Sequence, residues 1–198
     1  MKLLDFSQAA VRTKEELTAL IGTPHELVIK KTVSILDENC KRFISLSPLL
    51  FLSTCSADGK CDVSPRGDFP SSIKILNEKQ LIIPDRPGNK RLDSIHNMLS
   101  NPHVGLLFII PGMEEVLRIN GKAAIIKNET MLNDIWGQGQ APKLGIGVDV
   151  EECFIHCPRA LKSSKVWDSS SWRDKSELPS STEMFHAHLK LNGVELKK

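Results

Sequence analysis

Residues 49–68 read LLFLSTCSADGKCDVSPRGD, and in them the pattern of the chain changes from helical to β. The first seven residues form a compact apolar run of the length of a buried strand. Residues 57–60, Ala-Asp-Gly-Lys, have the composition of a tight turn, and residues 61–64 then return as a second strand. This stretch therefore predicts an antiparallel hairpin.

The same β character continues as far as residue 155. Further strands are expected in the apolar or alternating segments 72–76, 80–83, 104–110, 115–127 and 144–155. Two helices are expected between strands, at 89–99 and 129–136. Many short antiparallel strands joined by tight turns are typical of a barrel or a sandwich, and we expect about six strands in this one.

The residues before the hairpin are expected to be helical. Thr13 and Glu16 have the spacing of a capping box ahead of an apolar stripe. The sequence Thr-Pro-His-Glu at 23–26 predicts a second helix start, with threonine as the N-cap, and the pattern continues to about Asp37. A short third helix is expected to end before Pro48.

These patterns divide the chain into three parts. Residues 1–47 are expected to form a helical segment packed on the β domain, and residues 48–167 the β domain itself. Residues 168–198 are expected to form a C-terminal tail that includes a helix at 182–191, followed by a glycine.

The composition is that of an ordinary soluble protein. Hydrophobic residues make up 40% of the chain and charged residues 25%, and the formal net charge is only +2. Such a balance gives no overall attraction to nucleic acid or to a membrane surface, and no apolar run approaches the length of a membrane span. Asp5 interrupts the N-terminus where a signal peptide would continue its apolar stretch, so we expect a cytoplasmic protein.

The five cysteines do not form the pattern of a disulfide framework, because their number is odd and their spacing uneven. Cys153, His156 and Cys157 lie close in sequence, but in an extended segment His156 would point away from the two cysteines. No Cys-x-x-Cys pair occurs either, so we expect no metal site.

The densest functional signal is the loop of residues 84–91, which reads PDRPGNKR between a predicted strand and a predicted helix. Its glycine permits a tight turn, and its asparagine is placed to cap the helix. Free N–H groups at a helix N-terminus favour an anion, whereas the cations Arg86, Lys90 and Arg91 oppose the helix dipole unless a counter-anion is present. The loop therefore predicts a phosphate site, with a solvated basic loop as the alternative.

Two other positions are candidates to face a ligand. The strand at 61–64 leads into the polar segment Ser64-Pro65-Arg66. Arg118 is a charge within an apolar strand, which predicts an arginine that either reaches outward or has an ion-pair partner, with Asp68 and Asp85 as candidates.

The order of the motifs resembles a known family. The motifs are VSPRGD at 63–68, IIPDRPGNKR at 82–91, NPHVGLLF at 101–108, LRINGKA at 117–123 and CPRALKSSKVW at 157–167. Together they resemble the pyridoxamine 5′-phosphate oxidase-like, FMN-binding split-barrel flavoproteins, in particular a branch with Ser-Pro-Arg-Gly-Asp and Pro-Gly-Asn-Lys-Arg motifs. The resemblance covers residues 48–167. It implies a mainly β (α+β) fold, a six-stranded antiparallel split β-barrel with N-terminal and peripheral helices.

The resemblance also implies a homodimer with FMN in the groove between the subunits. The helix-start residues would hold the FMN phosphate, and the ends of the two preceding strands would contact the flavin. With the loop cations, the candidate cofactor-binding residues are Ser64, Pro65, Arg66, Pro84, Asp85, Arg86, Asn89, Lys90, Arg91, Arg118, Lys165 and Trp167.

The chain departs from true pyridoxamine 5′-phosphate oxidases where these bind their substrate. An FMN-binding arginine and a substrate-binding lysine of that group fall near Ser64 and Phe69, and the chain has no tyrosine to hold the substrate phosphate. We therefore expect an FMN-dependent oxidoreductase for another small molecule, with unknown catalytic residues and no role in nucleic-acid or membrane binding. A non-catalytic flavin carrier, a redox sensor, a deazaflavin protein and a haem binder using His103 or His156 are the alternatives.

Overall fold

The structure is a computed structural model, and it describes residues 3–194. The chain divides into two units, Met1–Cys157 and Pro158–Lys198. The division falls before residue 167, where we expected the β domain to end.

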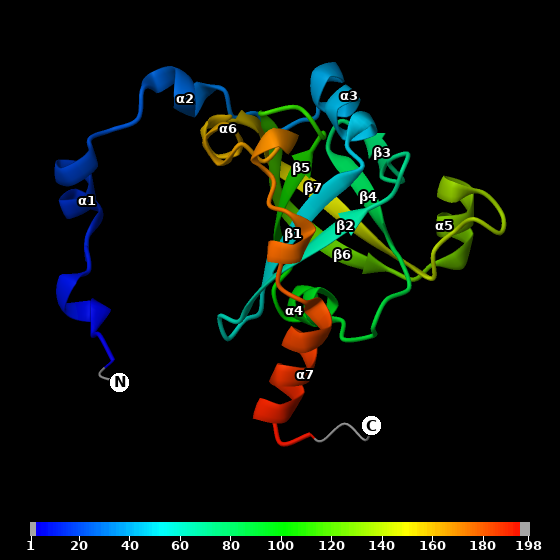
Figure 1. Cartoon of the computed structure of the whole chain (residues 1–198). Helices are drawn as coiled ribbons and strands as arrows, with labels where there is room; N and C mark the ends of the chain where they lie inside the picture. Colours follow the sequence, from blue (N-terminus) through cyan, green and yellow to red (C-terminus); the bar gives the residue numbers. More distant parts are fainter. Residues whose placement is uncertain (1–2, 195–198) are drawn as a thin grey trace. The chain divides into compact units, whose positions relative to one another are not determined.

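The first unit is built on one antiparallel sheet with the strand order β2-β1-β5-β6-β7-β4-β3 (Figure 1). The strands are β1 (Leu49–Cys55), β2 (Cys61–Gly67), β3 (Lys74–Asn77), β4 (Gln80–Asp85), β5 (His103–Ile109), β6 (Val116–Ile126) and β7 (Leu144–His156). The expectation of six strands is corrected to seven within the described residues. Strand β3, a four-residue edge strand, falls in the segment expected at 72–76, so each of the seven predicted segments forms a strand and only the number six was too low.

The sheet curls around a single hydrophobic core without closing into a complete barrel. Strand β1 is second in the sheet and β4 is sixth, yet their buried side chains belong to one cluster. Within residues 3–194, the edge strands β2 and β3 do not pair with each other. The core residues supplied by the strands include Leu50, Leu52, Leu81, Ile83, Leu106, Phe108, Leu117, Ile119, Ile146 and Val148.

Three helices contribute side chains to the interior of this unit. Helix α3 (Glu38–Leu46) buries Phe43 and Ile44, as expected for a short helix that ends before Pro48. Helix α4 (Asp93–Ser100) packs against β1, β2 and β6, and α5 (Glu129–Trp136) has the predicted bounds.

The first N-terminal helix follows its sequence signal. Besides a short 3₁₀ turn, η1 (Phe6–Ala9), the segment contains α1 (Lys14–Ile21). The Thr13 side chain accepts a hydrogen bond from the Glu16 backbone N–H, as the capping spacing predicts.

The second N-terminal helix is shorter than predicted. Helix α2 (Glu26–Lys30) begins after His25 rather than after Thr23, and it ends well before residue 37. Val33 instead pairs with Cys153 of β7 through two backbone hydrogen bonds of 3.0 and 2.7 Å. A β-branched residue that finds a strand partner favours the extended conformation, so tertiary pairing overrides the helical pattern here.

The last part of the N-terminal segment is the part that packs on the sheet. Helices α1 and α2 bury no residue, whereas Leu36 and α3 belong to the core. None of the helices in the described residues has the length and apolar character of a membrane span.

The second unit is helical and exposes most of its surface. It contains α6 (Arg159–Ser164), the 3₁₀ turns η2 (Ser169–Ser171) and η3 (Lys175–Glu177), and α7 (Ser181–Leu191). Helix α7 matches the helix predicted at 182–191.

Candidate functional site

A cavity of about 500 Å³ lies in the first unit, between the end of β2, the end of β4 and the start of α4. Its walls also include the start of β1 and the segment of residues 71–73. Nine of the twelve predicted cofactor-binding residues line it: Ser64, Pro65, Arg66, Pro84, Asp85, Arg86, Asn89, Lys90 and Arg91.

Two ion pairs connect β2 to the end of β4 across this cavity. Strand β2 is one edge of the sheet and β4 lies next to the other edge, so only the curl of the sheet brings them together. Arg66 Nη1 lies 2.7 Å from Asp85 Oδ1, and Arg86 Nε lies 2.9 Å from Asp68 Oδ2. The first pair is the more buried, with side chains 22% and 16% exposed, so it is less screened by solvent.

A chain of hydrogen bonds fixes Arg66 from its other side. Arg66 Nε donates to Ser64 Oγ at 3.4 Å, the two hydroxyls of Ser64 and Ser94 lie 3.0 Å apart, and Ser94 Oγ donates to Asp62 Oδ2 at 2.5 Å. A hydroxyl has one proton, and Ser94 donates it to Asp62, so the proton between the two serines comes from Ser64. Arg66 is therefore held between Ser64 and Asp85.

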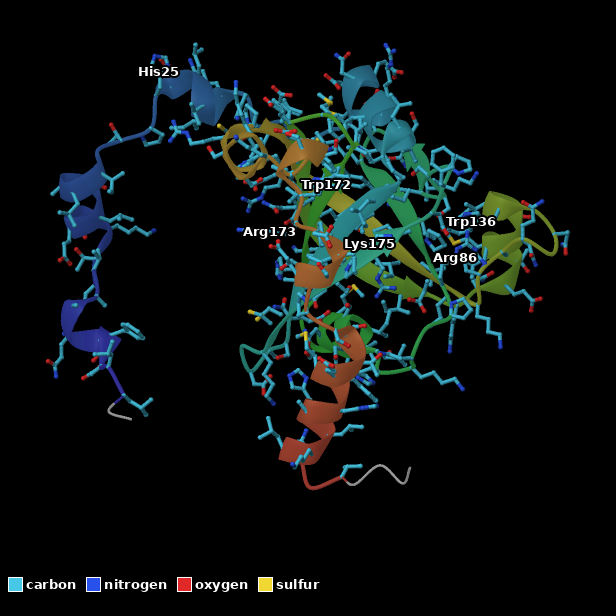
Figure 2. The ribbon with its side chains drawn as sticks, viewed as in Figure 1. His25, Arg86, Trp136, Trp172, Arg173 and Lys175 are labelled. Carbon is cyan, nitrogen blue, oxygen red and sulfur yellow. The ribbon has the colours of Figure 1, made fainter. Side chains whose placement is uncertain are left out.

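The Asp68 carboxylate is held ionised beside the cavity. Burial acts to raise the pKa of Asp68, but hydrogen bonds from Ser72 and Arg86 outweigh it, and the pKa lies below its usual value. The Ser72 carbonyl in turn accepts a 3.1 Å hydrogen bond from the indole N–H of Trp136. Figure 2 labels Trp136 and Arg86 on the α5 side of the unit. Helix α5 thereby helps to position Asp68 through its contact with Ser72.

The start of α4 differs from the prediction. The helix begins at Asp93 rather than at Asn89, and its N-cap residue, Leu92, forms no capping hydrogen bond through its side chain. The Asn89 side chain instead accepts a 3.0 Å hydrogen bond from the backbone N–H of Arg91. The prediction that Asn89 caps the helix is therefore wrong, because this side chain closes a local turn within the loop.

The unusual backbone of the loop is not at its glycine. Lys90 and Leu92 adopt the left-handed conformation, with φ of 62° and 60°, whereas Gly88 does not. Left-handed non-glycine residues cost on the order of 1–3 kcal/mol each and are common at ligand-binding positions. The tight-turn role assigned to Gly88 thus belongs to Lys90 and Leu92.

The cations of the cavity are mostly neutralised from within the chain. Besides the two pairs above, Arg91 Nε lies 2.5 Å from Asp93 Oδ2. The argument that Arg86 and Arg91 lack a counter-anion is therefore corrected. Among the residues that the structure describes, Lys90 forms no ion pair, and it stands beside the uncapped N-terminus of α4. The local signal for an anion is the combination of this lysine and this helix end.

The other three predicted residues are not among those that line the cavity. Arg118 is exposed on β6, with its guanidinium carbon 5.6 Å from the centre of the Phe154 ring and its Nε 3.4 Å from Asn120 Oδ1. Its proposed partners, Asp68 and Asp85, are paired with other arginines, so that expectation is wrong. Lys165 and Trp167 belong to the second unit, where Lys165 ends α6.

Sequence reasoning missed several polar residues that complete the cavity. They are Asp62, Ser72, Asp93 and Ser94. Asp68 was considered as a partner of Arg118, whereas it pairs with Arg86. Alternation along β2 could have identified Asp62, because it shares a strand face with Ser64 and Arg66. No local pattern could have identified Ser94, whose hydroxyl reaches Asp62 only through the packing of α4 on β2.

The comparison with known protein families covers the whole sheet. The model of the family described as pyridoxamine 5′-phosphate oxidase matches residues 36–157. The chain belongs to this family. The match begins at Leu36, the first core residue, and ends with the last residue of the first unit, so the sheet, α3, α4 and the cavity all lie inside it.

Several solved structures are similar to this chain at low sequence identity. A histidine-to-alanine variant of HupZ from Group A Streptococcus is 18% identical, with a TM-score of 0.50, over 61% of this chain and 99% of that one. A candidate pyridoxamine 5′-phosphate oxidase from Lactobacillus delbrueckii is 19% identical, with a TM-score of 0.50, over 62% and 95%. HutZ, the heme storage protein from Vibrio cholerae, is 16% identical, with a TM-score of 0.40, over 61% and 93%. No curated protein matches the sequence.

Two features considered from the sequence lie outside this site. His103 Nδ1 is 2.8 Å from Asn101 Oδ1, His156 is exposed at the end of β7, and neither lines the cavity. Within the described residues, no three histidine, cysteine, aspartate or glutamate side chains form a group that could hold a metal ion.

Proposed function

We propose that this chain is an FMN-binding flavoprotein that oxidises or reduces a small molecule other than pyridoxamine phosphate. The proposal rests on one observation. Lys90 and the N-terminus of α4, whose N-cap residue forms no side-chain hydrogen bond, both line the cavity of this member of the oxidase family. A helix N-terminus and an adjacent unpaired cation are a combination that suits a phosphate group.

The cavity has the size and lining that such a ligand requires. Its volume of about 500 Å³ lies within the usual range for small-molecule sites. Apolar side chains, among them Leu49, Leu50, Ile73 and Ile83, line the part between β1 and β4 and suit a planar ring. The FMN phosphate would lie at Asn89, Lys90 and Arg91, and the ring would lie along Ser64–Arg66 and against Pro84 and Asp85.

The residues around the ring would bind and orient the ligand. FMN, when bound, supplies the hydride or electron chemistry. Arg66 is fixed between Asp85 and Ser64, so its remaining N–H groups are hydrogen-bond donors held in a fixed orientation beside the ligand. The Asp68–Arg86 pair borders the same space and can exchange partners with a polar ligand.

The lining argues against two related functions. It contains no tyrosine and no lysine other than Lys90, and its three arginines are paired with Asp85, Asp68 and Asp93, so a second phosphate, such as that of pyridoxamine phosphate, would have to displace one of these carboxylates. It also contains no histidine, cysteine, methionine or tyrosine, the side chains that serve as axial haem ligands. A flavin carrier without turnover remains the second candidate, because no general base is apparent beside the ring position.

We further propose that two copies of the chain form a homodimer through the outer face of the sheet. A cross-strand row on this face consists of Pro65, Phe51, Leu107, Arg118 and Phe154, which lie opposite one another from β2 to β7. All five side chains remain exposed or half-buried within one chain. An apolar row of this kind is typical of an interface, and a dimer would carry Arg118 of one copy toward the ligand of the other.

The dimer proposal is testable by sizing chromatography with and without FMN. The wild type is expected at the mass of two chains, and Leu107→Arg at the mass of one, because a charge in the centre of the row would lose solvation without a partner. Leu99→Arg, on the exposed surface of α4, is the matched control and should remain dimeric. A wild type that elutes as a monomer under both conditions would contradict the proposal.

The flavin proposal is tested by the visible absorption spectrum of the purified protein. We expect a yellow protein with the two bands of an oxidised flavin, which bleach with a reductant and return in air. Mass spectrometry of the released cofactor distinguishes FMN from a deazaflavin, and a Soret band would identify haem instead. A colourless protein that takes up no flavin on incubation would overturn the proposal. Incubation of the yellow protein with candidate substrates then separates an enzyme from a carrier.

A further inference from the structure

Two cysteines flank the turn of the hairpin between β1 and β2. Cys55 is the last residue of β1 and Cys61 the first of β2, and they oppose each other in the strand register. Their sulfur atoms lie 3.7 Å apart. Cys61 is exposed and Cys55 is half-buried, so solutes can reach the pair.

The register places this pair where strand side chains approach most closely. The backbone bonds Ser56 N–H to Lys60 O, of 2.9 Å, and Asp68 N–H to Pro48 O, of 3.1 Å, mark the hydrogen-bonded positions at the two ends of the ladder. Hydrogen-bonded and non-hydrogen-bonded pairs alternate, so Cys55 and Cys61 form a non-hydrogen-bonded pair. Their Cα atoms are then about 4.5 Å apart, at the short end of the range that disulfides span, so the backbone does not need to move.

A second pair of thiols in the same unit lacks this access. The sulfur atoms of Cys40 and Cys153 are 3.4 Å apart, but Cys153 is completely buried. Burial raises the pKa of both Cys40 and Cys153, and the pKa of Cys55 is raised as well, first by its hydrogen bond with Cys61, so the direction of the pKa does not separate the two pairs. Proximity alone therefore does not distinguish the two pairs, whereas solvent access does.

We propose that Cys55 and Cys61 are a redox-active pair that hydrogen peroxide converts into a disulfide across the β1–β2 hairpin. In the first step, the more exposed sulfur of Cys61 attacks one peroxide oxygen; an S–O bond forms, the O–O bond breaks and one water leaves. In the second step, the Cys55 sulfur attacks the sulfenic sulfur; the S–S bond forms, the S–O bond breaks and a second water leaves. The two thiols lose two electrons and two protons, and one peroxide becomes two waters.

The position of the pair connects its redox state to the ligand cavity. Asp62, which follows Cys61, accepts the hydrogen bond from Ser94 at the start of α4. The hairpin is also bonded to the end of α4, since Asn97 Nδ2 donates to Lys60 O at 3.3 Å and Ser100 Oγ accepts from the Ala57 N–H at 3.2 Å. A disulfide would join β1 to β2 next to the turn and so restrict the separation of these two strands where they contact α4.

The test is peroxide titration of the full chain, carried out on the protein with and without flavin. The expected result is the loss of two of the five free thiols, a decrease in mass of two hydrogens, and a linked peptide that contains Cys55 and Cys61. Hydrogen exchange of the β2 peptides should become several-fold slower after oxidation and should recover after reduction. None of these readouts requires bound flavin, so failure of the FMN proposal would leave the result interpretable.

Two single variants make the assignment specific. In the Cys61→Ser variant, peroxide should form no disulfide within the chain. Each remaining cysteine should stay a thiol or stop at oxidation of its own sulfur. Cys157→Ser removes the other exposed cysteine and should still form the disulfide. Oxidation that proceeds to sulfinic acid on Cys61 without a link, or that joins two chains through Cys157, would overturn the proposal.

Discussion

The double variant Lys90→Met/Arg91→Met is expected to bind FMN about 10²–10³-fold more weakly than the wild type. Each hydrogen bond from a cation to a phosphate contributes on the order of 1.5–3 kcal/mol, and tenfold in affinity corresponds to about 1.4 kcal/mol. Lys90 is the larger contributor because it has no ion pair to give up among the described residues, whereas Arg91 must exchange Asp93 for the phosphate. The measurement is flavin fluorescence titration of the protein after removal of bound cofactor.

Riboflavin provides the internal control for this prediction. It has the same ring as FMN but no phosphate, so its affinity should be nearly equal in the wild type and the double variant. Lys74→Met/Lys79→Met, on the exposed β3–β4 hairpin, removes the same charge away from the cavity and should leave both affinities unchanged. Equal losses for FMN and riboflavin would mean that the loop does not bind the phosphate.

The Gly121→Ala variant is expected to lose about 3 kcal/mol of unfolding free energy, a large share of the stability of a typical domain. The register of β6 with β7 shifts at this residue, because Asn120 opposes Glu152 while Gly121 opposes Val150. A Cβ atom on Gly121 would lie 2.1 Å from the Asp149 carbonyl oxygen, which belongs to the backbone and cannot rotate away. The strands would have to separate at the longest ladder of the sheet.

Thermal and urea unfolding measure this effect against a matched variant. A loss of this size lowers the melting temperature by roughly 6–12 °C in a chain of this length. Gly105→Ala, on the neighbouring strand β5, is the control: its Cβ would lie 3.5 Å from the nearest atom, an ordinary contact, and its stability should change by less than about 1 kcal/mol. Equal stability of the two variants would contradict the strand register at Gly121.

Features that depend on neighbouring residues could be predicted from the sequence. The Thr13 cap, the bounds of α5 and the strands around 49–55 and 104–110 follow from local spacing and from apolar runs. The loop at 84–91 was also identified as the densest polar signal between a strand and a helix, and its residues line the cavity. In each case the deciding contacts lie within a few positions along the chain.

Features that depend on distant partners could not be predicted in this way. Helix α2 ends early because Val33 pairs with Cys153, about 120 positions away along the chain. Two outcomes were open for Arg118: an outward-reaching side chain, or an ion pair with Asp68 or Asp85. The side chain reaches outward over Phe154, and the ion pair does not form because the curl of the sheet gives those two carboxylates to Arg66 and Arg86.

Apolar periodicity, turn residues and motif order are local, so the sequence alone was enough to predict the β architecture, the family resemblance and the loop at 84–91 whose residues line the cavity. Only the tertiary structure decided how the cavity is charged. The curl of the sheet brings Asp85 to Arg66 and Asp68 to Arg86, and the packing of α4 brings Ser94 to Asp62. Asp85, Asp68 and Asp93 neutralise the three arginines of the cavity, and within residues 3–194 Lys90 is the lining cation that forms no ion pair, which is why the proposed phosphate site rests on it.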